Sequence, residues 1–178
     1  MADKAQEPDT VRNAVPFDRA NVPGPKMAKA VKADVAGKLI SKAKRPLLIV
    51  GTAAVDNGVI EIVRKIAEKG ITVAATGSSL KHLKREGIDA SYVNLHVLVS
   101  YLKDPDWMGF DGKGGYDTAI FLGHTYYYAS QLMSTLKNFT NIKIISIDRH
   151  FHSNAQQSFG NLTPEDFIRA LDVVVAQL

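Results

Sequence analysis

Four short segments of small, polar or charged residues have the composition of a ligand pocket, and each directly follows an apolar run typical of a buried strand. In open parallel sheets, ligands bind beyond the carboxyl ends of the strands. Small residues there let backbone N–H groups approach a phosphate. We therefore predict a nucleotide pocket formed by Gly51, Thr52, Ala53, Thr76, Gly77, Ser78, Gly123, His124, Tyr126, Asp148 and Arg149. The alternative is that Gly, Ser and Thr simply form the turns that end any strand.

The known phosphate-binding fingerprints are absent from the sequence. Gly51 and Gly58 are too far apart for a G-x-G-x-x-G turn, and the Gly-Lys-Gly at 112–114 lacks the Ser or Thr of a P-loop. No spacing fits a nucleophile elbow or a Ser–His–Asp arrangement. The residues therefore predict a nucleotide-type pocket without obvious catalytic groups.

Two aromatic motifs have alternative interpretations. His150 and His152 could present two imidazoles on one face of an extended segment, with Asp148 as a third metal ligand. Because no cysteine or carboxylate cluster accompanies them, we predict no metal site. The three tyrosines at 126–128 open a predicted helix, in which successive residues point about 100° apart. At least one must face solvent, a ligand ring or a partner, while the others pack in the core.

Cysteine is missing from all 178 residues. This excludes disulfides, cysteine-ligated iron–sulfur clusters, cysteine-based zinc sites and a cysteine nucleophile on this chain. Any redox chemistry that the chain serves must depend on a group held in another way or by another protein.

Apolar runs that alternate with amphipathic segments must position the candidate residues. We predict strands at 47–50, 71–75, 90–95, 118–122 and 142–147, and helices at 59–69, 79–86, 97–102, 126–138 and after Thr163. Strands that alternate with helices form a parallel sheet covered on both faces. The predicted fold is an α/β, Rossmann-like three-layer sandwich with a parallel sheet.

The first 44 residues precede this alternation. The prolines of residues 1–25 predict an extended N-terminal arm. It is either a disordered tail or a segment that orders against a partner through Val11, Val15, Phe17 and Val22. Residues 26–44 have apolar residues at helical spacing and are rich in lysine, which predicts a basic amphipathic helix leading into one α/β domain over 26–178. Its basic face is either solvated or contacts an acidic partner or a ligand phosphate.

Composition and charge exclude several classes of protein. The chain is 46% hydrophobic and 22% charged, with a formal net charge of +4. No stretch approaches the roughly 20 apolar residues of a membrane span, and the N-terminal residues do not resemble a secretory signal. The lysine-rich segment lacks the interleaved aromatics and arginines of a nucleic-acid surface. We expect a cytoplasmic protein that binds neither a membrane nor a nucleic acid.

Four stretches of the chain resemble the epsilon subunit of the archaeal acetyl-CoA decarbonylase/synthase (carbon monoxide dehydrogenase) complex. They read SKAKRPLLIVGTAA, ITVAATGSS, DTAIFLGHTYYYASQ and IKIISIDRHFHSNAQQSFGNL. AKRPLLIVG and the strand end at Asp148 also resemble the central domain of thiamine-diphosphate enzymes. The resemblance implies a member of the deoxyhypusine-synthase-like NAD/FAD-binding superfamily.

The family resemblance also implies a role in archaeal one-carbon metabolism and methanogenesis. Epsilon subunits pair with the large alpha subunit, which holds the nickel–iron–sulfur chemistry, in an alpha-two, epsilon-two component. The implied role is to stabilise that component, without catalysis of its own, and to help electrons reach FAD, whose site would be the strand-end residues named above. Alone, the chain could form a homo-oligomer. The alternative is a free-standing FAD- or NAD-dependent oxidoreductase, which would need an acid or base that the sequence does not identify.

Overall fold

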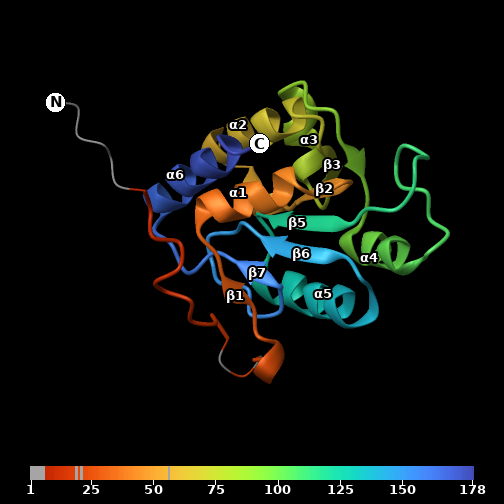
Figure 1. Ribbon diagram of the computed structural model, residues 1–178. Helices are drawn as coiled ribbons and strands as arrows, with labels where there is room; N and C mark the ends of the chain where they lie inside the picture. The colour runs from red at the N-terminus through yellow and green to blue at the C-terminus, as the bar shows by residue number, and fades with distance from the viewer. Residues whose placement is uncertain (1–6, 19, 21, 56) are drawn as a thin grey trace.

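The computed structural model describes residues 7–18, 20, 22–55 and 57–178. Within these ranges, seven parallel strands form one sheet in the order β1-β7-β6-β5-β2-β3-β4 (Figure 1). The strands are β1 (Lys29–Ala30), β2 (Pro46–Val50), β3 (Thr72–Ala75), β4 (Ser91–Tyr92), β5 (Thr118–Leu122), β6 (Lys143–Ser146) and β7 (Gln157–Ser158). The predicted α/β fold with a parallel sheet is confirmed.

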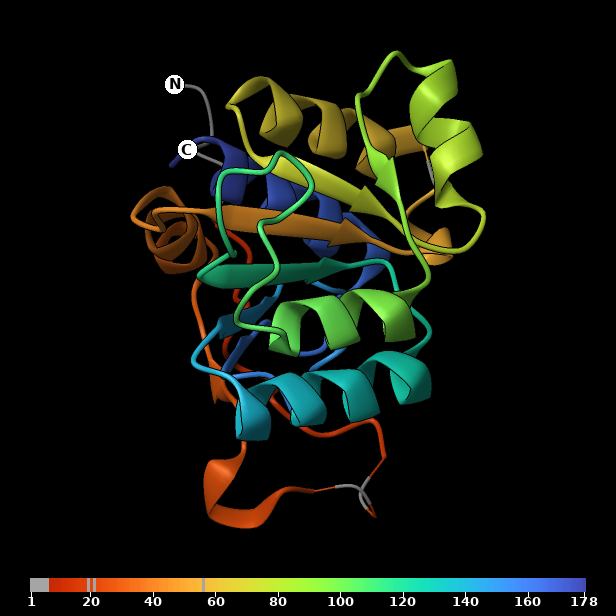
Figure 2. The same cartoon turned by 90° about the vertical axis from the view of Figure 1, so that its right-hand side faces the viewer.

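Helices cover both faces of the sheet (Figures 1 and 2). One face carries α1 (Ala33–Ser41), α2 (Asn57–Glu68), α3 (Ser79–Arg85) and α6 (Pro164–Val175), and the other carries α4 (Leu95–Lys103) and α5 (Tyr126–Phe139). Leu48 and Val50 of β2 pack on the first set, whereas Leu47 and Ile49 pack on the second. All four are fully buried, as expected for a central parallel strand. None of the described helices meets the length and hydropathy of a membrane span.

The chain winds outward from β2 in both directions. β3 and β4 follow on one side, and β5, β6 and β7 follow on the other, which is the strand order of a dinucleotide-binding Rossmann sheet with β1 added at the edge. The winding therefore reverses between β2 and β5. This switch point is where open α/β sheets bind their ligands.

The predicted helix at 26–44 is wrong in its first half. Within 26–44 the α-helix is confined to Ala33–Ser41, because the backbone before it pairs with β7 as the edge strand β1. Ala28 N donates to Ser153 O at 2.9 Å, and Val31 N donates to Ser158 O at 3.0 Å. A strand of two residues is too short to show the alternation that identifies a strand in a sequence. The helical spacing of the apolar residues in the same segment therefore led to the wrong prediction.

The predicted strand at 90–95 is also shorter than expected, since only Ser91 and Tyr92 pair with β3. Asn94 ends the extended segment as the N-cap of α4, and its side chain accepts a hydrogen bond from His96 N at 2.9 Å. By contrast, Thr163 caps α6 as predicted and accepts from Asp166 N at 3.1 Å.

The described part of the N-terminal arm packs against its own domain. Thr10 is buried, and its hydroxyl donates to Val31 O at 2.7 Å. Its carbonyl accepts from Gly160 N at 2.7 Å, and Asn13 O accepts from Asn161 N at 2.8 Å. These bonds tie the arm to the segments that follow β1 and β7, at one end of this edge. Residues 1–6, 19 and 21 of the predicted arm lie outside the described residues.

The apolar anchors predicted in the arm remain largely on its surface. Val15, Phe17 and Val22 are exposed, and the Phe17 ring lies 5.2 Å from the ring of Tyr126 and 5.5 Å from that of His150. The arm therefore reaches the N-terminal end of α5. Contact of these anchors with a partner protein stays a prediction.

Candidate functional site

The structure brings the predicted site residues together at one edge of the sheet, where neighbouring strands β6, β5, β2 and β3 end. A cavity of about 280 Å³ lies towards α6, and its lining includes Ala53, Gly123, His124, Asp148 and Arg149. A second cavity of about 170 Å³ lies towards α4 and α5, and its lining includes Gly51, Thr52, Thr76, Gly77 and His124. His124 thus separates the two cavities. Ser78 and Tyr126 line neither of them.

The two glycines at the switch point allow close packing of the loops that follow β2 and β5. A Cβ atom on Gly51 would overlap the carbonyl of Gly123. Gly123 has a φ of +73°, and its Cβ would overlap the backbone nitrogen of Ala54. Ala53 N donates to Gly123 O at 2.9 Å and so links the two loops where they cross. We refer to this contact between the loops as the crossing. Both glycines are therefore required by the fold itself, independently of any ligand.

Asp148 occupies the backbone amides at the end of β5. Its Oδ2 accepts from Gly123 N at 2.9 Å and from His124 N at 3.2 Å, and its Oδ1 accepts from Arg149 N at 2.8 Å. Clustered amides of this kind bind anions, but here they already hold an internal carboxylate. A phosphate could reach them only by displacing Asp148.

His124 is held as a neutral imidazole. Burial lowers the pKa of His124 to about 4, against the opposing effect of the nearby Asp148 carboxylate. Thr76 donates its hydroxyl hydrogen to Val50 O at 3.1 Å, and its oxygen lies 3.2 Å from His124 Nε2. We therefore assign the ring hydrogen to Nε2, which leaves Nδ1 as an acceptor.

Two nitrogen atoms near the first cavity have no hydrogen-bond partner among the described residues. They are the acceptor His124 Nδ1 and the donor Arg149 Nε, both buried. Buried polar atoms are normally paired, and an unpaired one costs about 1–3 kcal/mol. Because both atoms are shielded from solvent, a ligand in the cavity could reach them only after a shift of the His124 or Arg149 side chain.

Only the first tyrosine of the triplet packs in the core, whereas we expected two of the three to do so. The ring of Tyr126 stacks on His152 at 4.6 Å, and its hydroxyl donates to Phe151 O at 3.2 Å. Tyr127 and Tyr128 are exposed. His152 is buried, whereas His150 is partly exposed against Phe17. Within the described residues, no three His, Asp or Glu side chains are grouped to hold a metal ion.

The sequence did not identify the residues that line the two cavities but do not follow directly after a strand. The first cavity is also lined by His150 and by Pro164, Phe167 and Ile168 of α6. Thr163 correctly predicted the start of a helix, but nothing in the sequence indicated that this helix lies beside His124. The second cavity is closed by Asn94, Leu95 and Tyr128, which belong to α4 and α5.

The strand order and the position of these cavities define a Rossmann-like α/β domain. A family model described as "CO dehydrogenase beta subunit/acetyl-CoA synthase epsilon subunit" matches residues 10–175. The chain therefore belongs to the family of acetyl-CoA decarbonylase/synthase epsilon subunits, as the sequence resemblance predicted.

Curated relatives agree with this family over nearly their whole length. The chain is 44% identical over 176 residues to the acetyl-CoA decarbonylase/synthase complex subunit epsilon of Methanothrix soehngenii, covering 96% of this chain and 94% of the relative. It is 46% identical over 168 residues to subunit epsilon 2 of Methanosarcina mazei, covering 94% and 97%. A solved D-arabinose dehydrogenase from Sulfolobus solfataricus matches at 18% identity and a TM-score of 0.41, over 79% of this chain and 48% of that chain.

Because the loops that follow β2 and β5 pack so closely, we expect a methyl group at Gly123 to destabilise the folded protein strongly. Gly123→Ala should lower the free energy of unfolding by about 3 kcal/mol or more, because it combines an unfavourable φ with overlap on Ala54. Gly112 has a similar φ of +68° but open space around it, so Gly112→Ala should cost about 1 kcal/mol. Urea denaturation measures both. Equal costs would show that the crossing is not tightly packed.

The low pKa of His124 predicts a loss of stability in mild acid. The unfolded chain binds a proton near pH 6.5, whereas the folded state binds it only near pH 4. Stability is therefore full above pH 6.5 and falls towards pH 4, by up to about 3 kcal/mol. His124→Gln should flatten this part of the curve of unfolding free energy against pH. Parallel curves for wild type and His124→Gln would contradict the assignment.

Proposed function

We propose that this chain is a non-catalytic accessory subunit that stabilises the alpha subunit of the carbon monoxide dehydrogenase component in the acetyl-CoA decarbonylase/synthase complex. The observation that carries the proposal is the identity of 44–46% along nearly the full length of relatives named as epsilon subunits of that complex. The proposed stoichiometry is two alpha and two epsilon subunits.

The polar groups of the site are hydrogen-bonded to other groups of the same chain, which supports a role without catalysis. Asp148 accepts three backbone N–H groups, and His124 is neutral and bonded to Thr76. A general acid or base must exchange protons near its working pH, and burial removes His124 from that range. The absence of cysteine is consistent with metal clusters held by a partner.

For the cofactor, we propose FAD as the ligand of the cavity beside α6, where it would help electrons to pass through the complex. The support is the cavity itself, whose lining includes Arg149 and His124 as the polar side chains that would meet a ring edge or a polar group of the ligand. The amides of Gly123 and His124 give no support for a cradled pyrophosphate, because Asp148 occupies them. FAD supplies one- and two-electron chemistry that this chain's own side chains lack.

The exposed anchors of the arm support a contact with the alpha subunit. Phe17 is 56% exposed and packs on Tyr126 and Tyr127, which gives it a defined position. Removal of residues 1–25 would be a poor test, because it also removes the buried Thr10 contacts. A single substitution at Phe17 leaves those contacts in place.

Assembly provides the direct test of the accessory role. The full chain mixed with purified carbon monoxide dehydrogenase alpha subunit should elute as one species with the mass of two alpha and two epsilon subunits, measured by size-exclusion chromatography with light scattering. Phe17→Ser should weaken assembly about tenfold, as expected for the loss of an aromatic anchor. Val35→Ser, at an exposed apolar residue of α1 on the other side of the sheet, should not. A wild-type chain that does not associate would refute the proposed function.

Titration with FAD tests the cofactor proposal separately. We expect micromolar binding, followed by flavin fluorescence and calorimetry, that Arg149→Ala weakens about tenfold and Arg85→Ala on exposed α3 does not change. Gly51→Trp and Gly123→Trp are unsuitable as probes because both would break the loop crossing. Absence of FAD binding to a folded wild-type chain would remove the cofactor and leave the accessory role. Binding of NADH alone would favour the free-standing oxidoreductase.

A further inference from the structure

One wall of the first cavity is formed by a segment that also contacts the N-terminal arm. Arg149 and His150 line this cavity, and they belong to residues 149–151, which form neither a helix nor a strand. A segment without regular secondary structure is positioned by the groups that bond to it from neighbouring parts of the chain. We refer to residues 149–151 as the wall segment.

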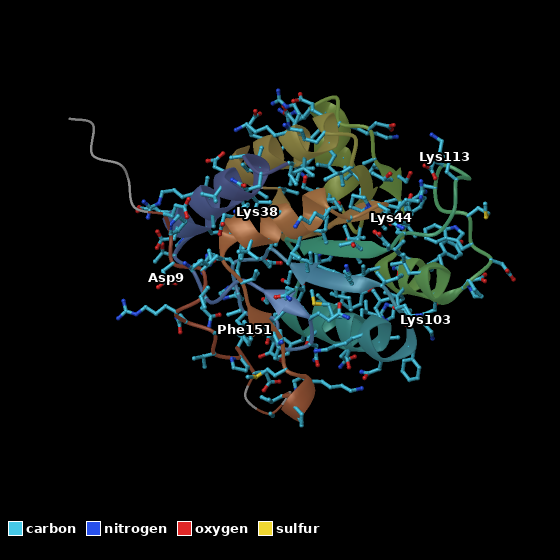
Figure 3. The ribbon with its side chains drawn as sticks, viewed as in Figure 1. Asp9, Lys38, Lys44, Lys103, Lys113 and Phe151 are labelled. Carbon is cyan, nitrogen blue, oxygen red and sulfur yellow. The ribbon has the colours of Figure 1, made fainter. Side chains whose placement is uncertain are left out.

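The side chain of Asn161 joins the wall segment to the arm. Its oxygen accepts from Phe151 N at 3.1 Å, and its nitrogen donates to Asn13 O at 3.1 Å and to Val15 O at 2.7 Å. The reverse orientation of the amide would satisfy none of these three groups. Figure 3 shows Phe151 on the side of the domain along which the arm runs. One side chain therefore fixes the cavity wall and the arm relative to each other.

The backbone on either side of this asparagine makes the same connection. Gly160 N donates to Thr10 O at 2.7 Å, and a Cβ atom on Gly160 would lie 3.0 Å from the nearest backbone atom of the arm. Leu162 N donates to Arg149 O at 2.9 Å. The arm thus packs closely on a short stretch of backbone that also holds the wall segment.

Phe17 provides a second contact between the arm and the wall segment. Its ring centroid lies 5.5 Å from that of His150 and 5.2 Å from that of Tyr126, although the residue is 56% exposed. The packed part of the ring faces the cavity wall, and the exposed part is free for a partner. A partner that covers Phe17 would therefore hold the ring against His150.

We infer that the arm and the first cavity are coupled, so that a protein subunit that fixes the arm raises the affinity of the cavity for its ligand. Asn161 is the positioning residue that transmits the effect. A wall that is fixed before the ligand arrives loses less conformational freedom when the ligand binds. The coupling is reciprocal, so the ligand must tighten assembly by the same factor. The inference rests on the proposed function, because it takes FAD as the ligand and the alpha subunit as the partner.

Variants of Asn161, which lies outside the lining of the first cavity, test the transmission in the full chain. Asn161→Asp keeps an oxygen for Phe151 N but removes the donor to Asn13 O and Val15 O, whereas Asn161→Ala removes all three bonds. We expect both variants to raise the Kd for FAD about tenfold, measured by calorimetry. The matched changes Asn141→Asp and Asn141→Ala, at an exposed asparagine outside this cavity, should change it less than about twofold. Thermal melting confirms that each variant folds.

The coupling itself is measured by titrating FAD into the chain alone and into the chain saturated with purified carbon monoxide dehydrogenase alpha subunit. The alpha subunit alone serves as the blank. For the wild type we expect the alpha subunit to lower the Kd for FAD about fivefold or more. For Asn161→Asp the change should be less than about twofold. Hydrogen exchange of the Phe151 amide should slow in the wild-type complex and not in the complex of the variant.

Each outcome separates this inference from the proposed function. A wild-type chain that binds both partners but has the same Kd for FAD with and without the alpha subunit would overturn the coupling and leave the proposed function intact. Coupling of full size in the Asn161 variants would overturn the role of this residue. A wild-type chain that binds no FAD, or no alpha subunit, would overturn that part of the proposed function and this inference with it.

Discussion

The structure depends on the crossing of two loops at the switch point of the sheet. Gly51 and Gly123 let the backbones that follow β2 and β5 pack on each other, and Asp148 fixes the second loop by accepting its N–H groups. This crossing sets the direction in which α5 leaves the sheet, and with it the position of His124. Gly123 lines the first cavity and Gly51 the second, so the crossing lies between them together with His124.

The same interaction explains why a nucleotide-type fold can lack a nucleotide-type phosphate cradle. Rossmann domains bind pyrophosphate with amides at a strand end and a helix N-terminus. Here the carboxylate of Asp148, which follows β6, takes the amides that follow β5, and burial keeps His124 neutral. Among the described residues that line the first cavity, His124 Nδ1 and Arg149 Nε are buried without a hydrogen-bond partner. The fold is thereby stabilised by groups that an enzyme of this class would reserve for its ligand.

The arm and the first cavity meet at one segment of the chain. Asn161 bonds Phe151 N on the side of the cavity and two carbonyl groups of the arm on the other side. Phe17 stays exposed although its ring packs on that of His150. An exposed aromatic side chain that is held in a fixed position suits a chain whose relatives are named as subunits of a complex.

The sequence by itself determined the strands β2, β3, β5 and β6, the helices between them and the edge at which the site residues meet. Each of those elements is a local apolar run or period, and parallel topology alone brings strand ends together. Only the tertiary structure decided the short strands β1 and β7, the use of Asp148 as an internal ligand and the bonds of Asn161 to the arm and the cavity wall. These depend on contacts between residues far apart in the chain, such as Asp148 with Gly123 or Thr10 with Val31. A local sequence pattern cannot predict such contacts, because they stabilise the protein only when segments far apart in the chain are packed together.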